Sequence, residues 1–534
     1  MRPLLAVLIV TLITRVIPLV VWPKRPCVRD ECTYLDLAAE IWRGNGMVGT
    51  RGWLWAPGYP GLAALHQGIF DRLDAIKWTQ VGAAVGTAYL LFRLTRAQFG
   101  TRAAVIAGML FAINPTHIFY ATAWLSEGLY TGLLFATLVS IGWARGETTD
   151  GVSRPERALV VGLLLGGCVL FRGIATYLLP CVALGLLWGR VRAPAAWVSV
   201  GLMTVAAVLV VAPYSAYATN KFDAFIVSDR TLGQMMWLGN NEFEPITFDF
   251  GNGLLREDDF DRVTRSGRAH CALVQRPADQ DACELANGVA WIKENPGEFI
   301  SRMPLRVSQM LTPHSLLTRT LRSGRWAGMP EWMDELLIVG VAGFSFVTLL
   351  GGTVGLFAKG KGWFAVTSAA VVAYHIAAIA CLAGLSRYRV PLEPGTHHLD
   401  PLLAGYRLPH DFTNFIFGVW GGARRRCARV AAGPVREGAG HLGQVAVLRR
   451  TPSTPLAAPR RRLRATAAGV RRLRSGAGRL AVVAGGRVPA SRYFSMPPVH
   501  VEQPPQPPRS FALAFGFRKV ADNLKVKDIT ATPP

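Results

Sequence analysis

Side chains that could transfer a proton or bind a phosphate stand at a few separate places in the sequence. Asp30 and Glu31 form an acidic pair after the first apolar stretch, and Glu127 opens a later one. A carboxylate can accept the proton of an attacking hydroxyl, whereas guanidinium groups bind phosphate through paired hydrogen bonds. The arginines that suit the second task are Arg172, Arg387 and Arg389.

Each of these residues also has a structural interpretation. The acidic pair suits the solvated first turn of a helix, where carboxylates favour the helix dipole. Glu127 suits an interfacial side chain that reaches water, although burying such a charge in a membrane costs roughly a few kcal/mol and marks a functional candidate. The arginines suit anchors to anionic head groups. Asn240 and Asn241 follow a glycine and suit a turn as well as a substrate contact.

Long apolar runs determine the class of protein. Of 534 residues, 51% are hydrophobic and 17% are charged, which excludes an ordinary soluble enzyme and a wholly disordered chain. We predict an all-α polytopic membrane protein with about nine transmembrane helices, the first of them an uncleaved anchor. The predicted spans are 3–22, 78–96, 103–121, 124–143, 158–171, 174–189, 196–218, 336–357 and 363–384, and the short fifth span could form one broken unit with the sixth.

Basic residues between these spans predict the orientation. They gather between spans two and three, between four and five, after six and after eight. By the positive-inside rule, all four loops are cytoplasmic if the N-terminus is cytoplasmic. Residues 23–77 and 219–335 then form two extracytoplasmic loops.

Cysteines and histidines add two expectations. In an oxidising compartment the cysteines of the outer loops are spaced for two local disulfides. We find no cysteine and histidine cluster with zinc spacing, and we predict His117 and His375 to be lone buried histidines. The predicted disulfides are Cys27–Cys32 and Cys271–Cys283.

The last part of the chain differs in composition. Residues 395–534 hold 23 basic and 6 acidic residues, against 35 and 28 in residues 1–394. This segment is rich in Arg, Ala, Gly and Pro, and we predict either a disordered basic tail or a segment read out of frame. Sequencing codons 385–405 of the gene in all three frames distinguishes the two.

Short motifs occur in a fixed order through residues 1–394. They are Asp30-Glu31-x-x-Tyr34 with Ala38, Pro57-Gly58-Tyr59-Pro60, Asn114-Pro115 followed by Ser126-Glu127, Arg172, Trp237-Leu238-Gly239-Asn240-Asn241, Asn295-Pro296 and Arg387-Tyr388-Arg389-Val390-Pro391-Leu392-Glu393-Pro394. In order, spacing and sidedness they resemble the GT-C superfamily of membrane glycosyltransferases. The most similar branch holds the protein O-mannosyltransferases, the aminoarabinose transferase of lipid A and the RgtA/B/C/D-like bacterial proteins.

The resemblance implies a reaction. A monosaccharide would pass, with inversion, from a polyprenyl-phosphate carrier to an acceptor on the extracytoplasmic face. One carboxylate base suffices, because a phosphate ester leaves without a proton donor. The resemblance makes Asp30 that base, with Glu31 orienting it or acting as the base instead. It assigns substrate binding to Glu127, Tyr34, Arg172, Asn240, Asn241, Arg387 and Arg389.

The same resemblance sets the expected partners. These are a lipid-linked sugar donor, membrane lipid and an unidentified acceptor, with no nucleic acid, no metal and no cofactor besides the donor. The expected address is a bacterial plasma membrane. Two other function classes stay open. One is a transporter or flippase for lipid-linked sugars, whose intramembrane charges would line a path. The other is an inactive, truncated family member.

Overall fold

The computed structural model describes only part of the chain. The contacts divide the chain into two units, Met1–Arg407 and Leu408–Pro534, and every described residue lies in the first. The segment from residue 400 onward, including most of the predicted tail, lies outside the described residues. The described residues are 2–21, 27, 30–48, 54–147, 154–242, 271, 274, 276–312, 317–318, 331–359 and 362–399.

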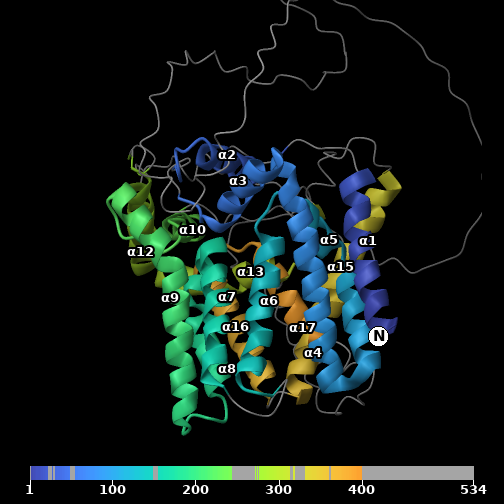
Figure 1. Cartoon of the computed structure of the whole chain (residues 1–534). Helices are drawn as coiled ribbons and strands as arrows, with labels where there is room; N and C mark the ends of the chain where they lie inside the picture. The colour runs from blue at the N-terminus through green and yellow to red at the C-terminus, as the bar shows by residue number, and fades with distance from the viewer. Residues whose placement is uncertain are drawn as a thin grey trace, which may run out of the picture. The chain divides into compact units, whose positions relative to one another are not determined.

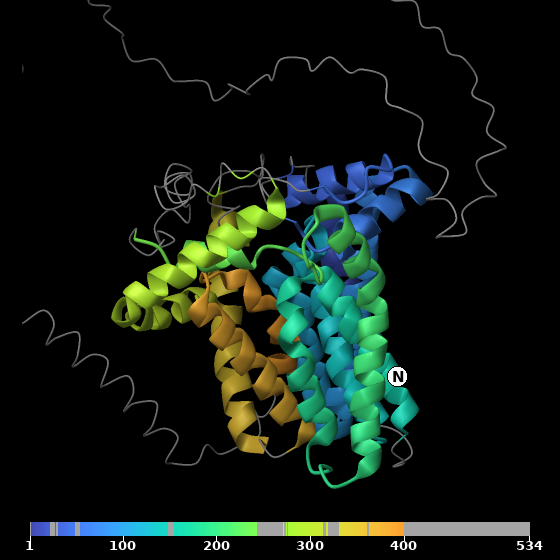
Figure 2. The same cartoon turned by 90° about the vertical axis from the view of Figure 1, so that its left-hand side faces the viewer.

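Among the described residues, all regular secondary structure is helical apart from one isolated bridge between Leu54 and Arg230. Figures 1 and 2 show long helices packed side by side, with shorter helices gathered at one end. The helices of the bundle are α1 (Arg2–Val21), α4 (Ile76–Ile113), α5 (Pro115–Thr122), α6 (Glu127–Ala144), α7 (Ala158–Phe171), α8 (Leu179–Leu187), α9 (Pro194–Phe222), α15 (Glu331–Lys359), α16 (Trp363–Cys381) and α17 (Glu393–Leu399). The remaining α-helices are α2 (Asp30–Trp42), α3 (Gly58–Phe70), α10 (Leu232–Gly239), α12 (Pro277–Glu294) and α13 (Pro296–Leu311). Short 3-10 turns lie at Leu73–Ala75, Pro155–Arg157, Gly173–Leu178, Ser386–Tyr388 and Val390–Leu392.

Four of the described helices are long and apolar enough to cross a membrane. They are α1, α9, residues 332–353 of α15, and α16; the bent pair of Leu73–Ile113 with Pro115–Thr122 makes five if it counts as one span. The chain is therefore an integral membrane protein with a helical fold.

The prediction of about nine spans is not confirmed. Helix α7 has 14 residues and α8 has 9, and about 20 apolar residues are needed to cross a bilayer. The second predicted span lies within α4, and the third runs from α4 past Asn114 into α5; α4 itself consists of two helices joined by a kink at Gly100. There the backbone φ is +85°, a conformation that favours glycine. The chain reverses at this kink, as predicted between those spans, and Nε2 of Gln80 accordingly donates to the carbonyl oxygens of Ala121 and Ala123 at 3.1 and 2.8 Å.

Glycines bring two helices of the bundle into close contact. A Cβ atom on Gly162 of α7 would lie 2.1 Å from the carbonyl oxygen of Met203 in α9, and one on Gly166 would lie 2.9 Å from that of Ala207. Small residues four positions apart let helix backbones approach closely in membranes. This contact fixes α7, whose last turn leads into Arg172.

Both predicted outer loops contribute helices to one end of the molecule. Figure 1 shows α2, α3, α10 and α12 together at that end. The two predicted disulfides, Cys27–Cys32 and Cys271–Cys283, are confirmed. The loops therefore share one side, as predicted, whereas the side of the membrane stays a prediction.

Helix α12 packs on α10 through buried polar groups. Asp281 accepts a hydrogen bond of 2.7 Å from the backbone N–H of Gly233, where a Cβ atom would lie 1.9 Å from the carbonyl oxygen of Asp281. One helical turn on, Glu284 is buried and accepts a hydrogen bond of 3.4 Å from Gln280. Burial raises the pKa of Glu284 from 4.5 to about 7.

This pKa predicts how the stability changes with pH. Because the pKa of Glu284 is raised in the folded state, the contribution of its carboxyl group to the stability of the fold is complete below about pH 4.5. That contribution is lost as the pH rises through 7. We expect the unfolding free energy of the wild-type chain to fall by an amount on the order of 3 kcal/mol between pH 5 and pH 8. Glu284→Gln should abolish this fall, as measured by thermal or denaturant unfolding. The matched control is Glu294→Gln, an exposed acid of the same helix, which should keep the wild-type pH profile. Identical profiles for both variants would contradict the assignment.

Candidate active site

The two acidic side chains at the start of α2 point in different directions and contact different partners. Asp30 forms an ion pair with Nη1 of Arg387, and 32% of its side chain stays exposed. Glu31 is buried, and its Oε1 accepts a hydrogen bond of 3.1 Å from the backbone N–H of Trp124. Asp30 therefore faces a cation at the accessible end of the bundle, whereas Glu31 ties α2 to the connection between α5 and α6.

A second carboxylate lies beside the same arginine. Glu127 is in the first turn of α6 and is 1% exposed. Its Oε1 lies 2.8 Å from Nη1 of Arg172 and 4.0 Å from Nε of Arg387. A buried carboxylate is tolerated only when cations or donors compensate its charge, and here two guanidinium groups do so. The site is thus one cluster of two carboxylates and two guanidinium groups, which we call the acid–arginine cluster. Its members are Asp30, Glu127, Arg172 and Arg387.

The hydroxyl group of Ser126 and a group of aromatic rings around Tyr34 lie next to the cluster. The hydroxyl of Ser126 lies 3.2 Å from that of Tyr34 and accepts a hydrogen bond of 3.3 Å from Arg172. Trp55 and Tyr59 pack against Tyr34 with ring centroids 5.2 and 4.9 Å away. Burial raises the pKa of Tyr34, so its phenol stays protonated near neutral pH.

One aromatic ring lies near both arginines. The guanidinium carbons of Arg172 and Arg387 lie 5.2 and 5.8 Å from the ring centroid of Tyr388. Cations are attracted to the face of such a ring. Tyr388 and Ser126 were not predicted as site residues, although each is adjacent in the sequence to a predicted one. Adjacency to Arg387 and Glu127 was the available signal.

Arg389 lies outside the acid–arginine cluster. Its Nε donates to Glu393 at 3.0 Å, and its Nη2 donates to Ser345 at 2.8 Å. Nη1 donates to the carbonyl oxygens of Leu311 and Thr312. The side chain is buried and is committed to the interior of the bundle. A direct role for Arg389 in substrate binding stays a prediction.

The two predicted asparagines also make internal contacts. Asn240 donates to the carbonyl oxygen of Cys381 at 3.0 Å and accepts from Arg306 at 3.0 Å. Asn241 donates to the carbonyl oxygen of Trp237 at 2.9 Å. Both are buried and connect α10 with α13 and α16. Contacts between these asparagines and a substrate stay predictions.

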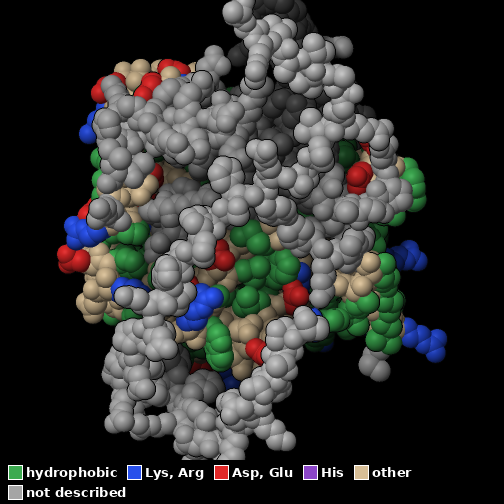
Figure 3. Space-filling model, turned by 90° about the horizontal axis from the view of Figure 1, so that it is seen from above, with side chains coloured by type: hydrophobic (Ala, Val, Ile, Leu, Met, Phe, Trp, Pro, Cys, Tyr) green, Lys and Arg blue, Asp and Glu red, His purple; other side chains and the backbone are tan. Residues whose placement is uncertain are grey.

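The acid–arginine cluster can combine a proton acceptor with an anion site. Asp30 is the more accessible acid, and Arg387 beside it is 20% exposed. Viewed from this end, acidic and basic side chains lie around hydrophobic ones at the described surface (Figure 3). Among the described residues, one group could hold a metal ion, His117, Glu393 and His397, and it lies in the interior of the bundle.

Comparisons with known proteins give matches among solved structures. No protein-family model matches the sequence, and no curated protein matches it. The apo oligosaccharyltransferase of Archaeoglobus fulgidus is similar at 13% identity and a TM-score of 0.45, over 78% of this chain and 52% of that chain. ArnT from Cupriavidus metallidurans, bound to undecaprenyl phosphate, is similar at 13% identity and a TM-score of 0.38, over 76% and 78%. The chain spans about half the length of the archaeal structure.

The Glu127–Arg172 pair should stabilise the fold only as a pair. Arg172→Met leaves a buried carboxylate undercompensated, and we expect a loss of about 3–5 kcal/mol in unfolding free energy. Glu127→Gln combined with Arg172→Met should lose less than Arg172→Met alone, because no buried charge is stranded. Unfolding of the purified variants in detergent measures the difference. Arg276→Met, an exposed arginine, is the control and should change stability by under about 0.5 kcal/mol. A double variant less stable than Arg172→Met would contradict this role.

Proposed function

We propose that this chain is a glycosyltransferase that moves a monosaccharide from a polyprenyl-phosphate carrier to an acceptor with inversion. The observation that carries the proposal is the acid–arginine cluster at one end of a membrane-embedded bundle, in which the accessible carboxylate of Asp30 pairs with Arg387 and the buried carboxylate of Glu127 lies near Arg172 and Arg387. The order of the sequence motifs supports the same reaction class. The sugar and the acceptor stay unassigned.

Asp30 is the proposed base. The acceptor hydroxyl attacks the anomeric carbon and gives its proton to the Asp30 carboxylate. The bond between that carbon and the phosphate oxygen breaks, and the phosphate leaves with the electron pair. A single displacement of this kind inverts the anomeric centre. Glu31 supports Asp30 indirectly, because its hydrogen bond to the N–H of Trp124 holds the first turn of α2 in place.

Arg387 and Arg172 are the proposed phosphate ligands. Charge grows on the leaving phosphate, and guanidinium groups in a water-poor site stabilise it. Arg387 is partly exposed and contacts Asp30, so binding of a phosphate beside it would draw it from the base. Arg172 is held by Glu127 and Ser126, so its guanidinium group stays at the site when Arg387 shifts.

Glu127 and Tyr34 are the proposed contacts with sugar or acceptor hydroxyls. Oε1 of Glu127 faces Arg172, whereas Oε2 is buried and makes no hydrogen bond within the described structure. A buried carboxylate oxygen in this state can accept a hydrogen bond from a ligand hydroxyl. The protonated phenol of Tyr34 can donate one.

The proposed address is a bacterial plasma membrane with the site on the extracytoplasmic face. Both disulfides belong to the loops at the end that holds the acid–arginine cluster, and disulfides persist in oxidising compartments. The connections α6–α7 and α8–α9 carry arginines such as Arg145 and Arg190 and lie at the opposite end, as the positive-inside rule requires of a cytoplasmic face. The proposed reaction uses no metal and no cofactor besides the donor.

Replacing the proposed base tests the function. We expect Asp30→Asn to lower transfer by about 100- to 10,000-fold, the usual contribution of a general base. The assay measures release of undecaprenyl phosphate from a panel of undecaprenyl-phosphate pentoses and hexoses, with wild-type and variant chains at equal levels in membranes. The control is Glu40→Gln, an acid of the same helix whose partners are Arg43 and Asn45, and it should retain activity.

Two outcomes would contradict the proposal. Near-normal turnover by Asp30→Asn would exclude this residue as the base. Equal chemical labelling of a cysteine placed at Glu127 from both sides of the membrane, without any transfer, would support a transporter instead.

A further inference from the structure

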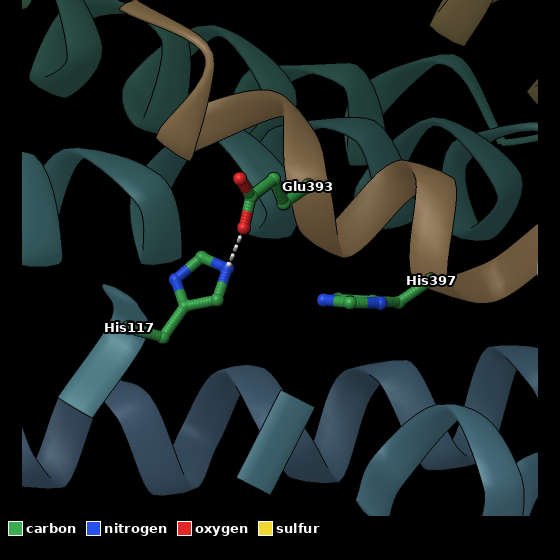
Figure 4. A group of neighbouring side chains, drawn as sticks. All are labelled: His117, Glu393 and His397. Atoms are coloured by element: carbon green, nitrogen blue, oxygen red, sulfur yellow. Dashed lines mark ion pairs between the residues drawn. The ribbon is translucent and has the colours of Figure 1, made fainter. Parts of the chain in front are cut away.

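A polar group lies in the interior of the bundle, where the proposed reaction does not use it. His117 comes from α5, and Glu393 and His397 come from α17. All three are buried, with 5% or less of each residue exposed. Each offers one ligand atom within 4.8 Å of the others. Figure 4 shows the two α17 side chains reaching toward His117.

The spacing of these atoms suits a common metal ion. Nε2 of His117 lies 3.1 Å from Oε2 of Glu393. Two ligands of a tetrahedral zinc ion, each bonded at about 2.0–2.1 Å, lie about 3.3 Å apart. His397 follows Glu393 by four residues and so lies on the same face of the helix. In Figure 4 a ring nitrogen of His397 points toward the other two side chains, so a small side-chain rotation would complete three ligands.

Neighbouring residues hold the carboxylate in one orientation. Arg389 donates to Oε1 of Glu393 at 3.0 Å, and Asn114 donates to Oε2 at 3.1 Å. Asn114 is itself fixed, because its side-chain oxygen caps α5 by accepting from the N–H of Thr116 at 2.9 Å. Hydrogen bonds of this kind orient metal ligands, and they leave one lone pair of Oε2 for an ion.

The other cation near the group does not occupy the same position. Arg15 of α1 is buried and donates to the carbonyl oxygens of Phe111 and Ala112 at the end of α4. These carbonyl groups carry the negative end of the helix dipole and compensate its charge. Arg15 therefore closes the break between α4 and α5 without taking a ligand from the three residues.

We propose that His117, Glu393 and His397 bind a divalent zinc-class ion that joins α5 to α17. Two imidazoles favour such an ion over magnesium or calcium, which prefer oxygen ligands. The ion takes the place of the proton between Nε2 of His117 and Glu393, and that proton moves to Nδ1, so that His117 binds as a neutral imidazole. A water molecule takes the fourth position and closes the tetrahedron. The site is separate from the proposed transfer reaction and does not rest on it.

The test uses the full chain, purified in detergent and stripped with a chelator. Titration with Co²⁺ should give the visible absorption of a tetrahedral ion, and Zn²⁺ should displace it with about one ion per chain. Zn²⁺, but not Mg²⁺, should raise the melting temperature. His397→Gln and His117→Gln should each weaken binding at least tenfold. His375→Gln is the matched control, because this buried histidine of α16 contacts the carbonyl oxygen of Val371 and lies outside the group.

Some results would overturn the proposal. They are absence of a stoichiometric ion, equal binding by all three variants, or an ion on the surface without imidazole ligands. X-ray absorption of the zinc-loaded wild-type chain covers the case in which a variant does not fold. It should show two imidazoles and oxygen ligands at about 2.0–2.1 Å. A sulfur shell near 2.3 Å would instead place the ion on cysteines. A chain that folds normally with no ion would leave the group as a hydrogen-bonded cluster.

Discussion

The buried ion pair between Glu127 and Arg172 is the constraint on which the site depends. A carboxylate that is 1% exposed inside a helical bundle requires a cation, and Arg172 lies 2.8 Å away. The pair connects the start of α6 with the end of α7. The close contact between α7 and α9 at Gly162 fixes the position of α7 and so of Arg172 at its end. Arg387 then brings Asp30 to the same place. Removing the pair would separate elements that are far apart in the sequence.

Sequence reasoning identified the residues of this cluster because sidedness is simple in membranes. Helices that cross and return place alternate ends on one side, so charges at those ends can meet. Asp30, Glu127, Arg172 and Arg387 are all brought together in this way, and both disulfides form where the loop cysteines predicted them. Their catalytic and binding roles remain to be tested by the experiments above.

Other features depend on the direction of single side chains, which spacing does not determine. Glu31 is adjacent to Asp30 yet faces Trp124, and Arg389 is two residues from Arg387 yet faces Glu393. The span count treated every apolar segment as a crossing, including 158–171, although its 14 residues are fewer than a bilayer requires. The buried histidine group was not found because His117 and Glu393 are 276 positions apart and His397 follows the predicted boundary at Pro394.

The segment from Ser386 to Leu399 connects the acid–arginine cluster with the buried histidine group. Its 3-10 turns send Arg387 toward α2 and α6 and Arg389 toward α15 and α17. The helix that follows packs Thr396 against Gly352, where a Cβ atom on the glycine would lie 2.4 Å away. His398 contacts a different helix, α4, through a hydrogen bond of 2.9 Å between its Nδ1 and the hydroxyl of Thr95. Residues beyond Pro394 thus fit the bundle closely, and a shift of α17 would move both arginines. The geometry of the proposed active site is therefore determined partly by packing in the interior of the bundle.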